Sequence, residues 1–139
     1  MKKIRFVFFS FSMVAILLFG SSRSIADPNV QWQFKSLGED ANGTPSTILS
    51  VLVNDNLNEI ATETGNFYII NPEDFKDNGI PKNALIACQC WWAGAGADYW
   101  VVKKGSTLVV MERDLSEGDP DHPYDYTSKP VKVKTIKLD

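Results

Sequence analysis

The segment best suited to chemistry is CQCWWAGAGADYW at residues 88–100, which holds both cysteines and three of the four tryptophans. A thiol becomes reactive when nearby positive charge and exposure to solvent lower its pKa. Aromatic side chains beside glycines offer a different use, because glycine lets a ligand or partner approach the backbone closely. The pattern of strands and turns around this segment indicates whether it is better suited to thiol chemistry or to binding a ligand or partner.

We expect residues 88–100 to form a β-hairpin with Gly94, Ala95 and Gly96 as its loop. This register places Trp91 opposite Tyr99 as cross-strand neighbours. It also places Cys90 opposite Trp100, and a turn at Lys104-Gly105 then brings the next strand alongside. Side chains alternate between the faces of a sheet, so the face assigned to the core carries Ile86, Cys88, Cys90, Trp100, Val102, Val109 and Met111. The opposite face, expected to be only partly covered, carries Leu85, Ala87, Gln89, Trp91, Tyr99, Val101, Leu108 and Val110; a slip of one residue would exchange the two.

This register disfavours redox chemistry at Cys88 and Cys90. Their Cα atoms would lie ~6.6 Å apart in an extended strand, near the upper limit for a disulfide. We interpret them as small buried apolar residues, with a strained and reducible disulfide as the alternative. Two cysteines alone do not make a four-ligand zinc site.

The candidate partner-binding residues therefore gather around the hairpin tip: Trp91, Gly94, Ala95, Gly96, Asp98 and Tyr99. Rigid aromatic side chains at the base of a loop are common anchors in protein interfaces. The alternative is that the glycines only form the turn and that both rings lie beneath another strand.

An acidic segment near the C-terminus offers a second kind of site. Its carboxylates could hold a calcium ion, although they do not follow the twelve-residue calcium-loop spacing; they are Asp114, Glu117, Asp119, Asp121 and Asp125. His122 is the only histidine and lies between prolines in what we expect to be a solvated turn. No nucleophile or phosphate-loop motif is present, and no cofactor is indicated, so a binding protein is favoured over an enzyme.

The first 26 residues have the layout of a secretory signal peptide. A basic start precedes an apolar run from Phe6 to Gly20, which is too short to span a membrane, and small polar residues follow up to Ala26. Residues 27–139 are then an exported, periplasmic or extracellular chain without a membrane anchor. They keep all 17 acidic residues but lose four of the 14 basic ones, so the net charge moves from −3 to about −7. This acidity disfavours nucleic acid as a partner and favours a basic protein.

The remaining sequence predicts a single all-β domain, a small sandwich or barrel of about seven or eight mostly antiparallel strands. The predicted strands are 30–37, 47–53, 57–63, 66–70, 84–92, 98–103, 106–113 and 131–138. Asn71-Pro72 followed by acidic residues predicts one short helical turn near 72–76. Lysines at 129, 132, 134 and 137 are typical of a strand at an exposed sheet edge.

The stretch Ala95-Gly96-Ala97-Asp98-Tyr99 resembles a loop of bacterial exported lysozyme inhibitors, which has the form Ser-Gly-x-x-Tyr. Gly96 and Tyr99 match, while Ala95 replaces the serine. The resemblance implies a small β protein that inserts this loop into the active-site cleft of a lysozyme. The leading hypothesis is accordingly an exported non-enzymatic binding protein, with a lysozyme-type glycosidase as its sharpest partner. The alternatives are a small enzyme or calcium-dependent domain using the 114–125 carboxylates, and a purely structural envelope domain.

Overall fold

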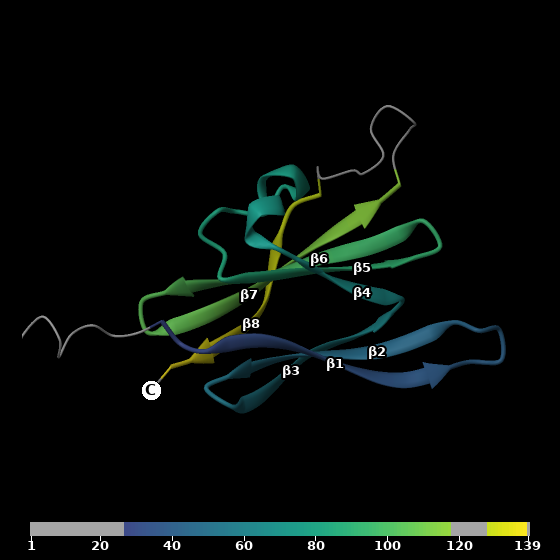
Figure 1. Cartoon of the computed structure of the whole chain (residues 1–139), viewed down its shortest axis with the longest axis horizontal. Coiled ribbons are helices and arrows are strands. Elements are labelled where there is room, and N and C mark those ends of the chain that lie inside the picture. Colours follow the sequence, from purple (N-terminus) through teal and green to yellow (C-terminus); the bar gives the residue numbers. More distant parts are fainter. Residues whose placement is uncertain (1–26, 118–127, 139) are drawn as a thin grey trace, which may run out of the picture.

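The computed structural model describes residues 27–117 and 128–138, which form two antiparallel β-sheets (Figure 1). Within these residues the sheets do not close into a barrel, so the sandwich form of the predicted all-β fold is confirmed. The proposed signal segment 1–26 lies outside the described residues. No helix in the described part of the chain is long and apolar enough to cross a membrane.

The first sheet has the order β1-β2-β3, and its strands are β1 (Val30–Glu39), β2 (Pro45–Val53) and β3 (Asn56–Thr64). The second sheet follows chain order from β4 to β8. Its strands are β4 (Asn66–Ile70), β5 (Ile86–Trp92), β6 (Ala95–Lys104), β7 (Thr107–Ser116) and β8 (Val131–Lys137). Every pairing between neighbours is antiparallel, as expected for a chain of short strands joined by tight turns.

Local turn chemistry explains where most strands end. Asn54 and Asp55 both adopt positive φ angles, 49° and 69°, and so form the two-residue turn between β2 and β3. After β4, Asn71-Pro72 begins the predicted helical turn, which the structure resolves into two 3-10 turns, η1 (Pro72–Asp74) and η2 (Lys76–Asn78). Gly79, with a φ of 67°, ends this segment in the left-handed conformation that favours glycine.

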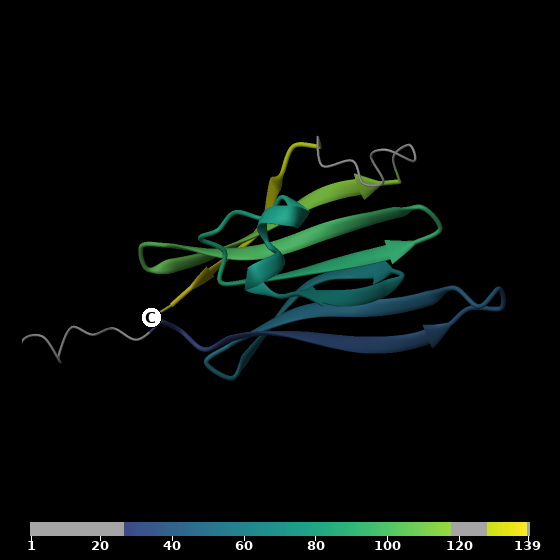
Figure 2. The same cartoon turned by 45° about the horizontal axis from the view of Figure 1, so that its top comes forward.

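The five-stranded sheet is covered on both faces. Its inner face packs against β1–β3, and the buried core there consists of Leu49, Val51, Val53, Cys88, Ala97, Tyr99, Val101, Leu108, Val110 and Ile136. Its outer face lies under the segment that contains η1 and η2, drawn in teal in Figures 1 and 2. Phe75, Ile80 and Ala84 of that segment pack there with Trp100 and Val102. The middle of β6, from Ala97 to Val102, is therefore buried on both faces of the sheet.

Candidate functional site

The hairpin between β5 and β6 turns at Ala93 and Gly94, so the predicted loop at Gly94-Ala95-Gly96 was wrong. Both turn residues have positive φ angles, 53° and 83°, as a type I′ turn requires. Trp92 pairs with Ala95 immediately outside the turn, and Ala95 is already the first residue of β6. The turn that forms has two residues, one fewer than the predicted loop, and it lies one residue earlier in the chain.

Contacts at Gly96 explain why the hairpin turns at Ala93 and Gly94. Gly96 pairs with Trp91, and a Cβ atom at this position would lie 2.2 Å from the carbonyl oxygen of Cys90 and 2.9 Å from Cδ2 of Trp91. Only glycine therefore leaves room for the Trp91 ring across the strand. The half-buried Trp91 indole also donates a hydrogen bond to Oε1 of Gln89, at 2.5 Å.

The new turn shifts the predicted β5–β6 register by three residues, and an odd shift moves the side chains of β6 to the opposite face relative to those of β5. Cys88 pairs with Tyr99 and Cys90 pairs with Ala97, so the predicted pairs Trp91–Tyr99 and Cys90–Trp100 were wrong. Trp91 and Tyr99 lie on opposite faces of the sheet. The cysteines remain on the buried inner face as predicted, but they share it with Tyr99, Val101, Leu108 and Val110, which were predicted to lie on the partly covered face. Trp100, Val102 and Val109, predicted to share the face of the cysteines, lie on the outer face.

The next hairpin differs from its prediction without changing faces. It turns at Gly105 and Ser106, and Lys104 pairs with Thr107. Trp100 therefore lies opposite Met111 instead of Val109, a shift of two residues. An even shift keeps the side chains of β7 on the predicted side relative to those of β6, so Met111 and Val109 follow Trp100 to the outer face.

Both cysteines are buried free thiols on the inner face. Burial raises the pKa of Cys88 well above its usual value, and burial together with Glu63 raises the pKa of Cys90 to about 11. The Cys90 thiol donates to the carbonyl oxygen of Thr64 at 3.4 Å. These thiols are protonated at neutral pH, which is the opposite of what nucleophilic or redox chemistry needs.

Asp98 lies at the centre of a polar network on the outer face and is fully buried. One carboxylate oxygen accepts a hydrogen bond from Nε2 of Gln89 at 2.8 Å, and the other forms an ion pair with Arg113. Burial raises the pKa of Asp98, while the hydrogen bonds from Gln89 and Arg113 and the charge of Arg113 oppose this shift. A predicted partner-binding residue is thus inaccessible.

Arg113 connects this network to the covering segment. Its guanidinium donates to the carbonyl oxygens of Gly79 at 3.0 Å and of Asn78 at 2.9 Å, and it lies 5.3 Å from the centre of the Trp100 ring. These contacts hold the end of η2 against β6 and β7. The buried charges of Asp98 and Arg113 are thus paired and hydrogen-bonded, and the role of this network is structural.

A second polar cluster lies on the inner face, around the hydroxyl of Tyr99. The hydroxyl donates to Oε2 of Glu112 on β7 at 2.5 Å, and Glu63 of β3 approaches it from the other sheet. Burial, and next the charge of Glu112, raise the pKa of Glu63, whereas its hydrogen bond with Tyr99 lowers it. Burial raises the pKa of Tyr99 far above its usual value, so the phenol stays protonated. Sequence analysis missed this pair of carboxylates because Glu63 and Glu112 are distant in sequence.

The proposed calcium ligands are only partly within the described residues. Asp114 is exposed near the end of β7, and Glu117 is exposed beside the β5–β6 hairpin. Asp119, Asp121 and Asp125, with His122, lie outside the described residues. Among residues 27–117 and 128–138 no group of three metal-binding side chains is found.

The exposed part of the hairpin is its tip, Trp92 to Ala95. The Trp92 side chain is 37% exposed, and Ala93 and Ala95 are exposed, while Gly94 and Gly96 are partly buried. The backbone N–H of Glu117 donates to the carbonyl oxygen of Gly94 at 3.0 Å, which fixes the tip to the end of β7. Within this hairpin Trp91 is partly buried and Tyr99 is fully buried, whereas the exposed large aromatic residue is Trp92. Its place directly before the turn is the signal that could have identified it.

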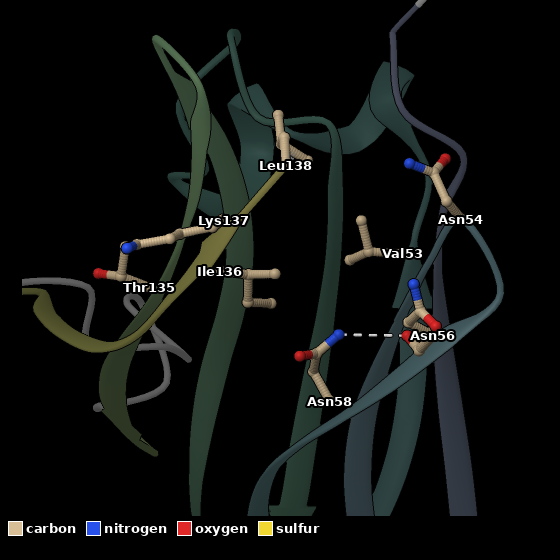
Figure 3. A pocket seen from close by; sticks show the side chains of 8 residues that line it. All are labelled: Val53, Asn54, Asn56, Asn58, Thr135, Ile136, Lys137 and Leu138. Atoms are coloured by element: carbon tan, nitrogen blue, oxygen red, sulfur yellow. Dashed lines mark hydrogen bonds between the residues drawn. The ribbon is translucent and has the colours of Figure 1, made fainter.

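A polar pocket of about 520 Å³ lies at the far end of the sandwich, between the β2–β3 turn and the end of β8 (Figure 3). Its polar lining residues are Asn54, Asn56, Asn58, Thr135 and Lys137. The Asn58 amide donates to the carbonyl oxygen of Asn56 at 3.1 Å, as drawn in Figure 3. The lining offers amide, hydroxyl and ammonium groups but neither a thiol, a histidine nor a side-chain carboxylate, so it is suited to binding more than to acid–base chemistry.

Comparison of the chain with protein-family models, with curated proteins and with solved structures found no match.

Proposed function

We propose that this protein is an exported, non-enzymatic binding domain that presents the β5–β6 hairpin tip, residues 92–95, to a protein partner. The observation that carries the proposal is Trp92, a large aromatic side chain left 37% exposed at the end of a rigid hairpin. The strands behind it are held by the Trp91–Gly96 contact and the buried Asp98–Arg113 pair. A preorganised aromatic anchor of this kind loses little entropy on binding.

The proposed partner is a basic protein, and the most specific version of this proposal is a lysozyme-type glycosidase. Residues 27–139 carry a net charge of about −7, which favours encounter with a basic partner. Glu117 places a carboxylate beside Gly94, where a Cβ atom would lie 3.4 Å from its Oε2. In this proposal the contact comes from Trp92, Ala95 and Glu117, and the buried Tyr99 supports the hairpin from behind.

The test is binding to, and inhibition of, lysozymes of several structural types by the purified protein. We expect Trp92→Ala to weaken binding at least about tenfold, because truncating an interface tryptophan commonly costs more than 1–2 kcal/mol. Leu57→Ala is the matched control, since Leu57 is exposed but lies on β3. If the protein bound none of the lysozymes, a lysozyme could not be its partner. If Trp92→Ala bound as tightly as the unaltered protein, the hairpin tip could not be the contact surface.

Export has a separate test that does not depend on the partner. Expression of the full chain should yield a protein whose N-terminal residue is Asp27 outside the cytoplasm. An uncleaved chain retained in the cytoplasm would contradict the export part of the proposal.

A further inference from the structure

The two open edges of the sandwich are protected very differently. At the β3/β8 edge, β8 carries Lys132, Lys134 and Lys137, and Nζ of Lys134 donates to the carbonyl oxygen of Glu59 on β3 at 3.2 Å. Lysines on an edge strand discourage the addition of another strand. The β1/β4 edge has no such protection on β4, whose sequence NFYII is uncharged.

Strand β4 is paired on one side only. Its partner is β5, and in the described part of the chain no other strand pairs with it. Tyr68 and Ile69 are 55% and 63% exposed. An uncharged edge strand with exposed apolar side chains and a free row of backbone donors and acceptors is a template for an added strand.

An apolar cleft of about 320 Å³ lies between β1 and one end of β4. Trp32, Ile69, Ile70, Phe75, Leu85 and Ile86 are among its lining residues. Nε1 of Trp32 is buried, and within the described residues nothing accepts its hydrogen bond. A buried donor without an acceptor is unfavourable, and a carbonyl group entering the cleft would correct this.

A second pocket, of about 330 Å³, lies at the other end of β4. Its lining includes Asn66 and Phe67 of β4 and Phe34 and Glu39 of β1. The rings of Phe34 and Phe67 stack with centroids 5.0 Å apart, which joins the two edge strands there. Glu39 is exposed and gives this pocket a carboxylate, so it suits a basic side chain where the first cleft suits an apolar one.

We propose that the β1/β4 edge binds an extended peptide segment of a partner protein, which adds as a strand beside β4. Its backbone bonds to the free side of β4, an apolar side chain enters the cleft at Trp32, and a basic side chain meets Glu39. Alternate residues of a strand share a face, so the two anchor side chains are separated by an even number of positions. This surface is distinct from the hairpin tip, and the inference does not depend on the function proposed there.

The test uses the ¹⁵N-labelled protein and the capped peptide Thr-Leu-Thr-Thr-Thr-Lys-Thr, which places leucine and lysine on one face. The matched control, Thr-Leu-Thr-Thr-Lys-Thr-Thr, has the same composition but places them on opposite faces. We expect the first peptide to move the Trp32 indole N–H resonance, which Trp32→Phe identifies, and to slow amide exchange along β4. The control peptide should bind at least about tenfold more weakly, because one anchor then points away from its pocket.

Variants at the two edges locate the site. Ile69→Lys should abolish peptide binding without unfolding the protein, since Ile69 is exposed. Val133→Lys makes the same change on β8, where Val133 is 40% exposed, and should leave binding unchanged. Glu39→Gln should weaken binding of the lysine-containing peptide about threefold, the typical effect of an exposed charge pair.

Several results would overturn the proposal. The first is equal peptide binding by Ile69→Lys and the unaltered protein, and an equivalent result is no movement of the Trp32 resonance with either peptide. The second is a dimer that Ile69→Lys dissociates, because a second copy of the chain would then occupy the edge. The third is movement of the Trp32 resonance by dodecanoic acid but not by the peptide, which would make the cleft a site for a small apolar molecule.

Discussion

Asp98 and Tyr99 are neighbours in β6, and Glu112 and Arg113 are neighbours in β7, yet each pair divides between the two faces of the sheet. On the outer face Asp98 meets Arg113 in a buried ion pair. On the inner face Tyr99 meets Glu112, with Glu63 opposite, and the cluster remains acidic. Tyr99 and Arg113 also pack under different coverings, the first sheet and the η1–η2 segment.

The difference shows which charges a small β domain can bury. Complete burial of Asp98 is accompanied by an opposite charge and by a hydrogen bond from Gln89. Among residues 27–117 and 128–138, no ion pair joins Glu63 or Glu112 to a basic side chain. Both carboxylates are only partly buried, so water and the shared Tyr99 phenol stabilise them. Removing one group from each cluster should therefore have effects of different size and different pH dependence.

The largest effect is expected for Arg113→Met. The change leaves the Asp98 carboxylate buried without its opposite charge and removes the donors to Asn78 and Gly79. We expect the free energy of unfolding to fall by about 3–5 kcal/mol, as for other broken buried ion pairs. Urea unfolding measures it.

The control for this prediction is the double variant Asp98→Leu/Arg113→Met, which removes both charges. It should recover part of the lost stability because no unpaired charge remains. If Arg113→Met alone lowered the free energy of unfolding by less than about 1 kcal/mol, water would have to reach the Asp98 carboxylate. That result would contradict the complete burial of the Asp98–Arg113 pair.

An intermediate effect is expected for Tyr99→Phe. The ring stays in the core beside Phe67, but Glu112 and Glu63 lose the hydroxyl between them. We expect a loss of about 1–2 kcal/mol at neutral pH, since a partly buried acceptor loses its donor. Chemical denaturation measures it, and Phe67→Leu reports on ring packing alone. No loss of stability would mean that the hydroxyl bond to Glu112 is replaced by water without cost.

The smallest effect, and the one with a distinct sign, is expected for Glu63→Gln. The ordinary pKa of a glutamate carboxyl, 4.5, applies to Glu63 in the unfolded chain, and the pKa of Glu63 in the folded protein is raised above it. Between these two pKa values the folded state therefore binds more protons than the unfolded state. Stability contributed by this group is therefore complete below about pH 4.5 and is lost as the pH rises through the folded pKa. Glu63→Gln removes this loss and should be more stable than the unaltered protein at pH 7, by less than about 1 kcal/mol after solvent screening.

The measurement is the difference in unfolding free energy between the two proteins at several pH values from 4 to 8. The difference should disappear in the acidic range, where Glu63 is protonated. Glu59→Gln changes an exposed carboxylate on the same strand and serves as the control. A variant that is less stable than the unaltered protein at pH 7 would contradict the raised pKa of Glu63, which burial and then the charge of Glu112 cause.

Much of the fold could be predicted from local sequence. The strand at Asn66–Ile70 has the predicted bounds, and the 3-10 turns begin at the predicted Pro72. Alternation of apolar residues and the turn residues that follow them act over a few positions, so they can be recognised without a tertiary structure. The candidate site was predicted less well, since Asp98 and Tyr99 are buried and Trp92, which is exposed, was not selected.

The sequence by itself determined that this chain forms short antiparallel strands, that its cysteines are buried, and that β8 is an edge strand, because each follows from residue type and near neighbours. Only the tertiary structure decided the register of β5 and β6, since Ala93-Gly94-Ala95-Gly96 permits more than one turn and the Trp91 ring fits only across Gly96. It alone brought Glu63 to Glu112 and placed β1 beside β4. These contacts join residues far apart in the chain, and the energy that selects them comes from packing between sheets, which no local pattern records.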